Sequence, residues 1–348
     1  MMTARRGTSP SKRRRRVAKR KFAALLLAIF SSAILFISSL FTPVTHAAAA
    51  RSIALTFDDL PMAVVGNDHV AGPLETTQRV NRELLDALRR HHATAIGFVN
   101  EAKLNVQGER DARAAILEDW LNAGMLLGHH GYRHVQLSDT TLEGYEDEFL
   151  RGNIITAPLL VQHHLAERYF RHPYLDTGDT QQKKQGFDTF LTAHGYAVAP
   201  VTMQNEDWMF NAPYTEARNQ RNVAEAKRVR DAYLAHTSAM FASAEDLARS
   251  TFGREIPLVI MMHDDLLNAE NLDAVLTLME QRGYRFVSLP DALADSAYRT
   301  PDLYYHGDGI SWLDRWQLAF GKPINAKPPE PPQWVQQQYS AITAPPKH

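Results

Sequence analysis

From residue 51 onward, short apolar runs alternate with longer segments of amphipathic, helical character. The runs predict seven strands: Ile53–Phe57, Thr94–Val99, Met125–Leu127, Tyr169–Phe170, Ala197–Thr202, Leu258–Met262 and Arg285–Leu289. The segments between them predict helices at Leu74–His91, Ala112–Ala123, Asp179–Ala193 and Leu272–Arg282, with one or two surface helices in Thr215–Ser250. Strands that alternate with helices favour parallel pairing through crossover helices. Because the unit recurs so often, we expect an α/β barrel rather than an open sheet.

The two ends of the chain have a different pattern. Residues 1–22 hold ten Lys and Arg and no acidic residue, Phe22–Phe41 is almost wholly apolar, and Thr45–Ala50 is rich in alanine. This order predicts an export signal or, given the length of the apolar run, an uncleaved signal-anchor. The body would then be periplasmic or extracellular, and any membrane association would come through the N-terminal segment. We therefore divide the chain into 1–50 (signal or anchor), 51–298 (barrel) and 299–348, an aromatic, Pro-rich extension. We expect this extension either to wrap around the body or to project from it as an extended tail.

Charge and composition exclude several functions. The chain has 38 Lys and Arg and 39 Asp and Glu, so removing the ten basic residues of the N-terminus leaves 28 against 39, a net charge of −11. A body this acidic is a poor match for nucleic acid. Cysteine is absent, which excludes disulfides and thiolate ligands and leaves nitrogen and oxygen for any metal. The sequence contains neither a dinucleotide-binding fingerprint nor a phosphate-binding loop, so no motif indicates an organic cofactor.

Candidate catalytic residues begin where the first predicted strand ends. Asp58 and Asp59 follow Ile53–Phe57, and the carboxyl ends of parallel barrel strands form the face on which active sites are built. Neighbouring carboxylates on a strand point to opposite sides unless the chain turns, and we expect Leu60-Pro61 to supply that turn. One carboxylate could then bind a metal while the other faces a water molecule.

A pair of histidines follows the third predicted strand. His130 and His134 are spaced i,i+4, which would place both on one side of a helical turn and let them chelate one ion. With Asp59 they would supply three ligands and leave a position open, the arrangement of a catalytic zinc site, although other divalent metals are compatible. His129 would stay outside the ligand set, either behind the ligands or facing solvent.

Further polar residues stand at later strand ends. Arg171 and Tyr174 lie in Arg-His-Pro-Tyr after Tyr169–Phe170, and Asp207 with Trp208 follows the fifth predicted strand. His263 follows Met261 at the end of Leu258–Met262, and a histidine suits general acid chemistry because its pKa lies near neutrality.

In this order the motifs resemble those of the NodB-like polysaccharide deacetylases, carbohydrate esterase family 4, over roughly Arg51–Asp295. The family's T-F-D-D, H-(S/T)-x-x-H, R-x-P-Y, D-x-x-D-W and L-x-H motifs are matched by Thr56–Asp59, His130–His134, Arg171–Tyr174, the segment ending at Asp207-Trp208, and Met261–His263. The resemblance implies a distorted (β/α) barrel and the following roles: Asp58 general base; Asp59, His130 and His134 metal ligands; His263 general acid; Arg171 orienting the base; Asp207 tuning the acid.

The expected activity is metal-dependent removal of acetyl groups from an N-acetylated polysaccharide or oligosaccharide, with zinc as the first choice of metal. The Tyr174 backbone N–H would help to hold the oxyanion, and Trp208 and Met261 would line the substrate site. Three alternatives stay open: an O-acetyl esterase acting on xylan-like polysaccharide, a small-amide hydrolase, and an exported, non-catalytic glycan-binding module.

Four departures from the family pattern concern the pocket more than the chemistry. Gly131 replaces the usual Ser or Thr, Leu60 replaces a Gly, Gln204 replaces an Asp, and Met261 replaces a Leu. In the extension, Tyr304, Tyr305, Trp312 and Trp316 could stack on sugar rings, but the i,i+4 tryptophans fit better as a seal at one end of the barrel.

Overall fold

The computed structural model describes residues 51–67, 69–165, 168–307, 309–324 and 327–344. The predicted signal or anchor, residues 1–50, lies outside these ranges. Within them, no helix combines the length and apolarity that crossing a bilayer requires. The described residues after position 50 belong to one compact unit, so the extension after residue 298 packs with the barrel.

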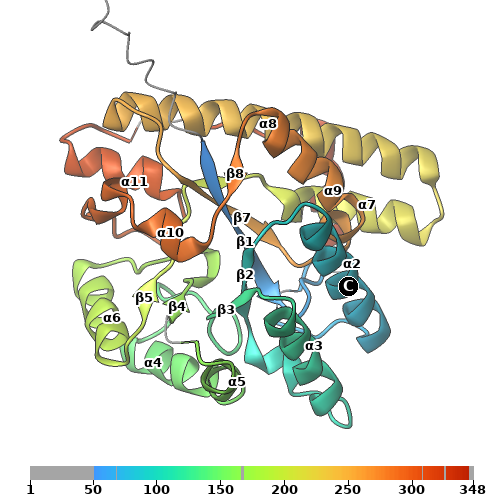
Figure 1. Cartoon of the computed structure of the whole chain (residues 1–348), viewed down its shortest axis with the longest axis horizontal. Helices are drawn as coiled ribbons and strands as arrows, with labels where there is room; N and C mark the ends of the chain where they lie inside the picture. Colours follow the sequence, from blue (N-terminus) through green and yellow to red (C-terminus); the bar gives the residue numbers. More distant parts are fainter. Residues whose placement is uncertain (1–50, 68, 166–167, 308, 325–326, 345–348) are drawn as a thin grey trace, which may run out of the picture. The chain divides into compact units, whose positions relative to one another are not determined.

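The core is a parallel sheet centred on β1 (Ser52–Leu60), whose residues from Ile53 to Leu60 are all buried (Figure 1). The other strands are β2 (Ala95–Val99), β3 (Leu126–His129), β4 (Tyr169–Phe170), β5 (Ala197–Val198), β6 (Met203–Gln204), β7 (Leu258–His263) and β8 (Arg285–Phe286). Their order is β5-β4-β3-β2-β1-β7-β6, with β8 beside β1, and every pairing is parallel.

The sheet curls toward closure through the short connection between β5 and β6. These strands stand at opposite ends of the order, yet only residues 199–202 separate them. The Ala199 N–H donates to Phe170 O at one edge (2.8 Å), and the Thr202 N–H donates to Val259 O at the other (3.0 Å). The single strand predicted at Ala197–Thr202 is therefore wrong, because the chain leaves one edge of the sheet and joins the other within it. The predicted class, a distorted parallel α/β barrel, is confirmed as an incompletely closed barrel.

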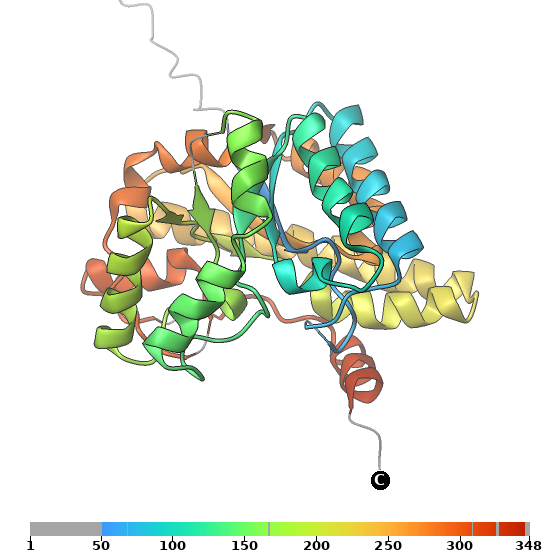
Figure 2. The ribbon, with the colours of Figure 1, turned by 90° about the horizontal axis from the view of Figure 1, so that it is seen from below.

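Helices surround this sheet (Figures 1 and 2). They are α2 (Leu74–Arg90), α3 (Arg110–Asn122), α4 (Leu142–Arg151), α5 (Thr156–Gln162), α6 (Gln181–Ala193), α7 (Asp207–Asn219), α8 (Val223–Phe252), α9 (Leu266–Gln281), α10 (Leu289–Leu293), α11 (Trp312–Ala319) and α12 (Gln333–Thr343), with 3₁₀ turns η1 (Glu101–Leu104), η2 (Pro173–Leu175) and η3 (Ser296–Arg299). The four helices expected between strands are confirmed within a few residues at most ends, because each repeats apolar positions every three or four residues.

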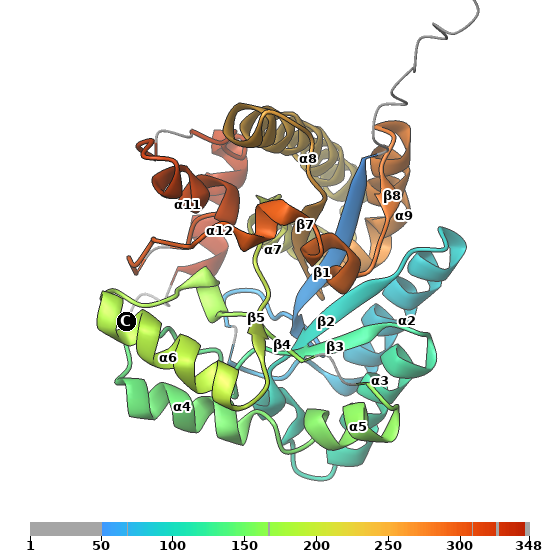
Figure 3. The ribbon, with the colours of Figure 1, turned by 60° about the vertical axis from the view of Figure 1, so that its left-hand side comes forward.

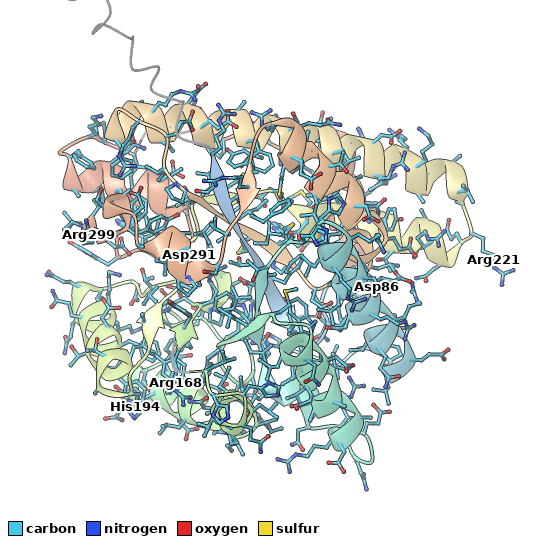
Figure 4. The ribbon with its side chains drawn as sticks, viewed as in Figure 1. Asp86, Arg168, His194, Arg221, Asp291 and Arg299 are labelled. Carbon is cyan, nitrogen blue, oxygen red and sulfur yellow. The ribbon has the colours of Figure 1, made fainter. Side chains whose placement is uncertain are left out.

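The polar stretch after β6 forms helices, as predicted: the end of α7 and most of α8. Helices α7 and α8 meet at a turn where the exposed Arg221 points away from the ribbon (Figure 4). One face of α8 is buried through Val229, Tyr233 and Phe241. The sequence understates this burial because a long helix that covers a barrel needs only a narrow apolar stripe.

The extension wraps the body. Helix α12 packs against α7, and α11 packs against α8 (Figure 3). Trp312 and Trp316 are buried, and the Trp316 ring meets Phe252 and Tyr298 edge-on at centroid distances of 5.6 and 5.3 Å. Stacking of these two indoles on sugar is therefore excluded; they belong to the core, as does Met203.

Candidate active site

The two aspartates at the end of β1 are separated by a bulge. The pairing of β1 with β2 shifts register between Phe57 and Leu60, and Asp59 takes a left-handed backbone with φ of 71°. Such a conformation in a non-glycine residue costs about 1–3 kcal/mol, a strain that proteins retain at functional sites. Both side chains are buried and line the same pocket. The expected turn therefore begins at Asp59, one residue before Leu60-Pro61.

The histidine pair converges by a different route from the predicted one. The chain from His130 to His134 forms no helical turn; it is an irregular loop in which Gly131 (φ 77°) and His134 (φ 59°) are left-handed. The two rings nevertheless lie with centroids 4.8 Å apart. A Cβ on Gly131 would meet only Pro173 Cγ at 3.7 Å, so the preference for glycine is conformational. Glycine stands here in place of the family's Ser or Thr because the left-handed turn that brings the two histidines together favours it.

His129 anchors this loop from behind. Its Nε2 lies 2.8 Å from Phe149 O, and its Nδ1 accepts the Gly131 N–H at 2.9 Å, so the ring proton belongs on Nε2. The imidazole is buried and stacks on Phe149 at 4.5 Å, and burial lowers its pKa to about 4. The solvent-facing alternative is therefore wrong, because both ring nitrogens are used inside the protein.

The predicted ligands Asp59, His130 and His134 form a buried group whose donor atoms all lie within 4.8 Å of one another. His130 Nδ1 lies 2.8 Å from Arg171 O, which makes it the protonated nitrogen and leaves the lone pair on Nε2 for a metal. Burial lowers the pKa of His130 to about 3, so the ring is neutral. Two imidazoles and one carboxylate at this spacing fit a divalent cation and leave room for a further ligand.

A buried lysine that no sequence motif indicates, Lys103, contacts the candidate ligand Asp59. This lysine of η1 is 1% exposed, and its Nζ lies 3.2 Å from both Asp59 Oδ1 and Asp59 O. Burial would raise the pKa of Asp59, but Lys103 and the histidines outweigh it and lower the pKa, so the side chain is a carboxylate. In the sequence, Glu101–Leu104 reads as an ordinary polar turn after a strand, and no motif marks the lysine.

Arg171 is hydrogen-bonded to Asp58. The guanidinium is fully buried, and its Nη1 donates to both oxygens of Asp58, at 3.1 and 3.2 Å. Its Nε donates to Ala199 O (2.8 Å) and its Nη2 to Thr56 Oγ1 (3.2 Å), which fixes the orientation of the fork. Burial raises the pKa of Asp58 even though the arginine opposes that shift.

The predicted acid and its partner form a tight pair. The Asp207 carboxylate lies 2.8 Å from His263 Nδ1 and accepts the His263 backbone N–H at 2.6 Å. Burial would lower the pKa of His263, but Asp207, with help from Asp59 and Asp58, raises it to about 10. The ring is therefore charged at neutral pH, and Nε2 is the nitrogen left for a substrate.

A chain of hydrogen bonds that the sequence did not reveal supports this pair. Asn268 Nδ2 donates to Asp207 Oδ2 (2.6 Å), Tyr233 OH donates to Asn268 Oδ1 (2.7 Å), and Asn205 Nδ2 donates to Tyr233 OH (2.8 Å). The participants come from α7, α8, α9 and the end of β6. They are far apart in sequence and carry no shared spacing, so only the fold assembles them.

One pocket of about 560 Å³ unites the site. Its walls include Asp58, the three candidate ligands and His263, together with the predicted substrate contacts Tyr174, Trp208 and Met261. Arg171 and Asp207 stand behind this wall. Tyr174 is left-handed (φ 55°), and its ring lies 4.4 Å from that of His134, centroid to centroid. Gln204, which replaces a family Asp, also faces the pocket.

Comparison with known proteins agrees with the motifs. The polysaccharide deacetylase family model matches residues 46–190, a range that contains Asp58, Asp59, His130, His134 and Arg171. The predicted resemblance to the NodB-like polysaccharide deacetylases is thereby confirmed. No curated protein matches the sequence.

Several solved structures are similar. A family 4 pseudoenzyme from Bacillus anthracis has 15% identity and a TM-score of 0.47, over 70% of this chain and 66% of that one. A family 4 carbohydrate esterase from Streptomyces lividans has 16% identity and a TM-score of 0.43, over 70% and 95%. A polysaccharide deacetylase from Bacillus cereus has 18% identity and a TM-score of 0.46, over 75% and 100%.

Proposed function

We propose that this protein is a metal-dependent hydrolase that removes acetyl groups from N-acetylated glycans. The observation that carries the proposal is the convergence, in one pocket, of a ligand triad with two further groups placed for proton transfer. Asp58 and His263 are paired residues in the register of β1 and β7, so base and acid stand side by side at the same strand ends. Such a set supports hydrolysis of an acyl bond better than it supports binding alone.

A divalent metal held by Asp59, His130 and His134, zinc being our first choice, would polarise the acetyl carbonyl and acidify water. Asp58 then takes the proton of the attacking water. Arg171 keeps both oxygens of that carboxylate in place, and His130 Nε2 lies 3.8 Å from Asp58 Oδ2, so the base adjoins the ligand set.

His263 completes the reaction by giving its proton to the departing amine. Asp207 binds Nδ1 and so holds the ring with Nε2 available on the pocket side. The Tyr174 backbone N–H is our candidate donor to the oxyanion, and Trp208 and Met261 are our candidate contacts to the sugar. We assign the reaction to an exported form of the chain, in the periplasm or outside the cell, cleaved from or tethered by residues 1–50.

The first test is acetate release from N-acetylated chito-oligosaccharides, with Asp58→Asn compared against Asp111→Asn, an exposed aspartate of α3. Loss of a positioned proton acceptor lowers a rate by about 10²–10⁴-fold, so we expect that loss for Asp58→Asn and wild-type activity for the control. Full activity in Asp58→Asn would overturn the assignment of the base.

Two further measurements separate the alternatives. Acetate released from acetylated xylan but not from N-acetylated sugars would make the protein an O-acetyl esterase, and binding without release would make it a glycan-binding module. Metal content measured on purified His134→Ala should fall below that of the wild type, and this readout is independent of activity. Equal metal content in the two proteins would contradict the ligand set.

A further inference from the structure

We propose that the C-terminal extension closes the pocket into a small-molecule site, which accepts a short neutral acetylated sugar or the end of a chain but not the interior of a polymer. This inference rests on the proposed function and specifies its substrate. It starts from the walls of the pocket, which are not confined to the barrel.

The extension supplies one whole side of the pocket. Ile310, Ser311, Asp314, Ile324, Pro328 and Tyr339 line the same space as Asp58 and His263. Another wall is the segment that follows β1, Ala63–Gly66. A volume of about 560 Å³ lies within the roughly 300–1,000 Å³ of sites that enclose small ligands. A polymer that crosses the catalytic residues needs a groove open at both ends.

The two walls touch each other. A Cβ on Gly66 would lie 3.3 Å from Thr343 Cγ2, so the end of α12 is in contact with the segment after β1. Tyr339 lies edge-on to Trp208 with ring centroids 4.9 Å apart, which joins α12 to α7 beside the pocket. Val335 is fully buried and fixes α12 on the body. Helix α12 is thus held on the body by one buried side chain and two contacts beside the pocket, and Figures 2 and 3 show it beside α7.

The extension also holds the segment that carries Tyr174. A Cβ on Gly309 would collide with Tyr174 O, so the two backbones are in direct contact and only glycine fits. Arg315 is fully buried; it donates to Leu175 O and, at 3.0 Å, to Thr177 Oγ1. The extension therefore positions η2 as well as covering it, which a dispensable tail would not do.

The charge of the walls narrows the ligand further. Glu206, Asp265 and Asp314 line the pocket in addition to Asp58 and Asp59, and the described lining residues include no lysine or arginine. Asp314 Oδ1 is buried without a hydrogen-bond partner in the described structure, while Ser311 donates to Oδ2 at 2.6 Å. The cationic His263 lines the barrel side of the pocket. The described residues of the extension side, by contrast, present no cation to a carboxylate and offer Ser311 and Asp314 to the hydroxyl groups of a neutral sugar.

The test is where along a chain the free amine appears. N-acetylated chitohexaose is incubated with enzyme, and mass spectrometry locates the deacetylated residue. The wild type should free amines predominantly at a chain end, with a low ratio of internal to terminal amines. Tyr339→Ala and Ile324→Ala, which open the wall, should raise the ratio of internal to terminal amines by about tenfold or more, the scale of a changed pocket contact. Ser340→Ala, an exposed neighbour on α12, should leave the pattern unchanged.

Each outcome decides a separate point. Internal amines made by the wild type in proportion to the number of internal residues would overturn closure while the proposed function stands. Faster turnover of N-acetylmuramic acid, which carries a carboxylate, than of N-acetylglucosamine would overturn the preference for neutral sugars. No acetate from any acetylated sugar, short or long, would overturn the proposed function and this inference with it.

Discussion

The two sides of the candidate site are built in different ways. The ligand side, Asp59, His130 and His134, is placed by backbone: it stands at the ends of β1 and β3, and left-handed residues at 59, 131 and 134 turn the side chains inward. The acid side, His263 and Asp207, is placed by side chains, through hydrogen bonds that reach Asn268 on α9 and Tyr233 on α8. The family model covers the first side and ends before the second.

The two sides are therefore sensitive to different kinds of substitution. The ligand side depends on a few residues with a left-handed backbone, so a substitution at one such position can displace it. Side-chain placement spans three helices and depends on every member being paired, because a partly satisfied buried network is worse than none. Changes on the acid side should therefore affect catalysis without affecting the metal, and changes on the ligand side should affect both.

The largest expected effect is on the acid side. Asp207→Asn keeps the shape but replaces the carboxylate that holds and charges His263, so turnover should fall by about 10²–10⁴-fold. Metal content should stay at the wild-type level. Steady-state kinetics and metal analysis on the same preparation check this, and a parallel loss of metal would show that the two sides are not independent.

Lys103→Met should have the next largest effect, on the ligand side. Removal of one partner from a buried ion pair costs about 3–5 kcal/mol, because the Asp59 carboxylate is left uncompensated. Added Zn²⁺ should restore the melting temperature of this variant by more than it raises that of the wild type, since the metal replaces the lost positive charge. Melting curves of both proteins with and without Zn²⁺ test this. An equal rise in melting temperature for the variant and the wild type would mean that Lys103 does not compensate the charge of Asp59.

Gly131→Ser tests backbone placement with a smaller change. The substitution restores the family hydroxyl but forces a side chain into a left-handed conformation, at a cost of roughly 1–2 kcal/mol. We expect a lower unfolding midpoint in urea with the metal site preserved. A more stable variant would show that the turn at Gly131 relaxes without strain.

The smallest expected effect concerns His236, which packs against Phe210 on the helices that support the acid side. Burial lowers its pKa to about 4, below the value of about 6.5 in an unfolded chain. Between these values only the unfolded state binds the proton, so stability is full above about pH 6.5 and is lost progressively as the pH falls towards 4. The loss should be at most about 1.4 kcal/mol per pH unit inside the window and should disappear in His236→Gln; an unchanged pH profile would contradict it.

Site residues could be predicted from the sequence where a motif directly follows a long apolar strand. Asp58 and His263 could be placed at strand ends because β1 and β7 are long apolar runs, and α2 repeats its apolar positions as far as Leu88. The histidine loop was misjudged because i,i+4 spacing also arises in irregular backbone when glycine permits a left-handed turn. Asn268, Tyr233 and the wall made by α12 could not be predicted, since their meeting depends on how helices distant in sequence pack.

We propose that Asp59, His130 and His134 hold a metal on which acetyl hydrolysis depends. Acetate release from N-acetylated chito-oligosaccharides by protein stripped with chelator and titrated with Zn²⁺ tests this dependence. We expect activity to return in step with bound metal and to level off at one ion per chain, with no return in His134→Ala. Full activity of the stripped protein, or equal recovery in His134→Ala, would contradict it.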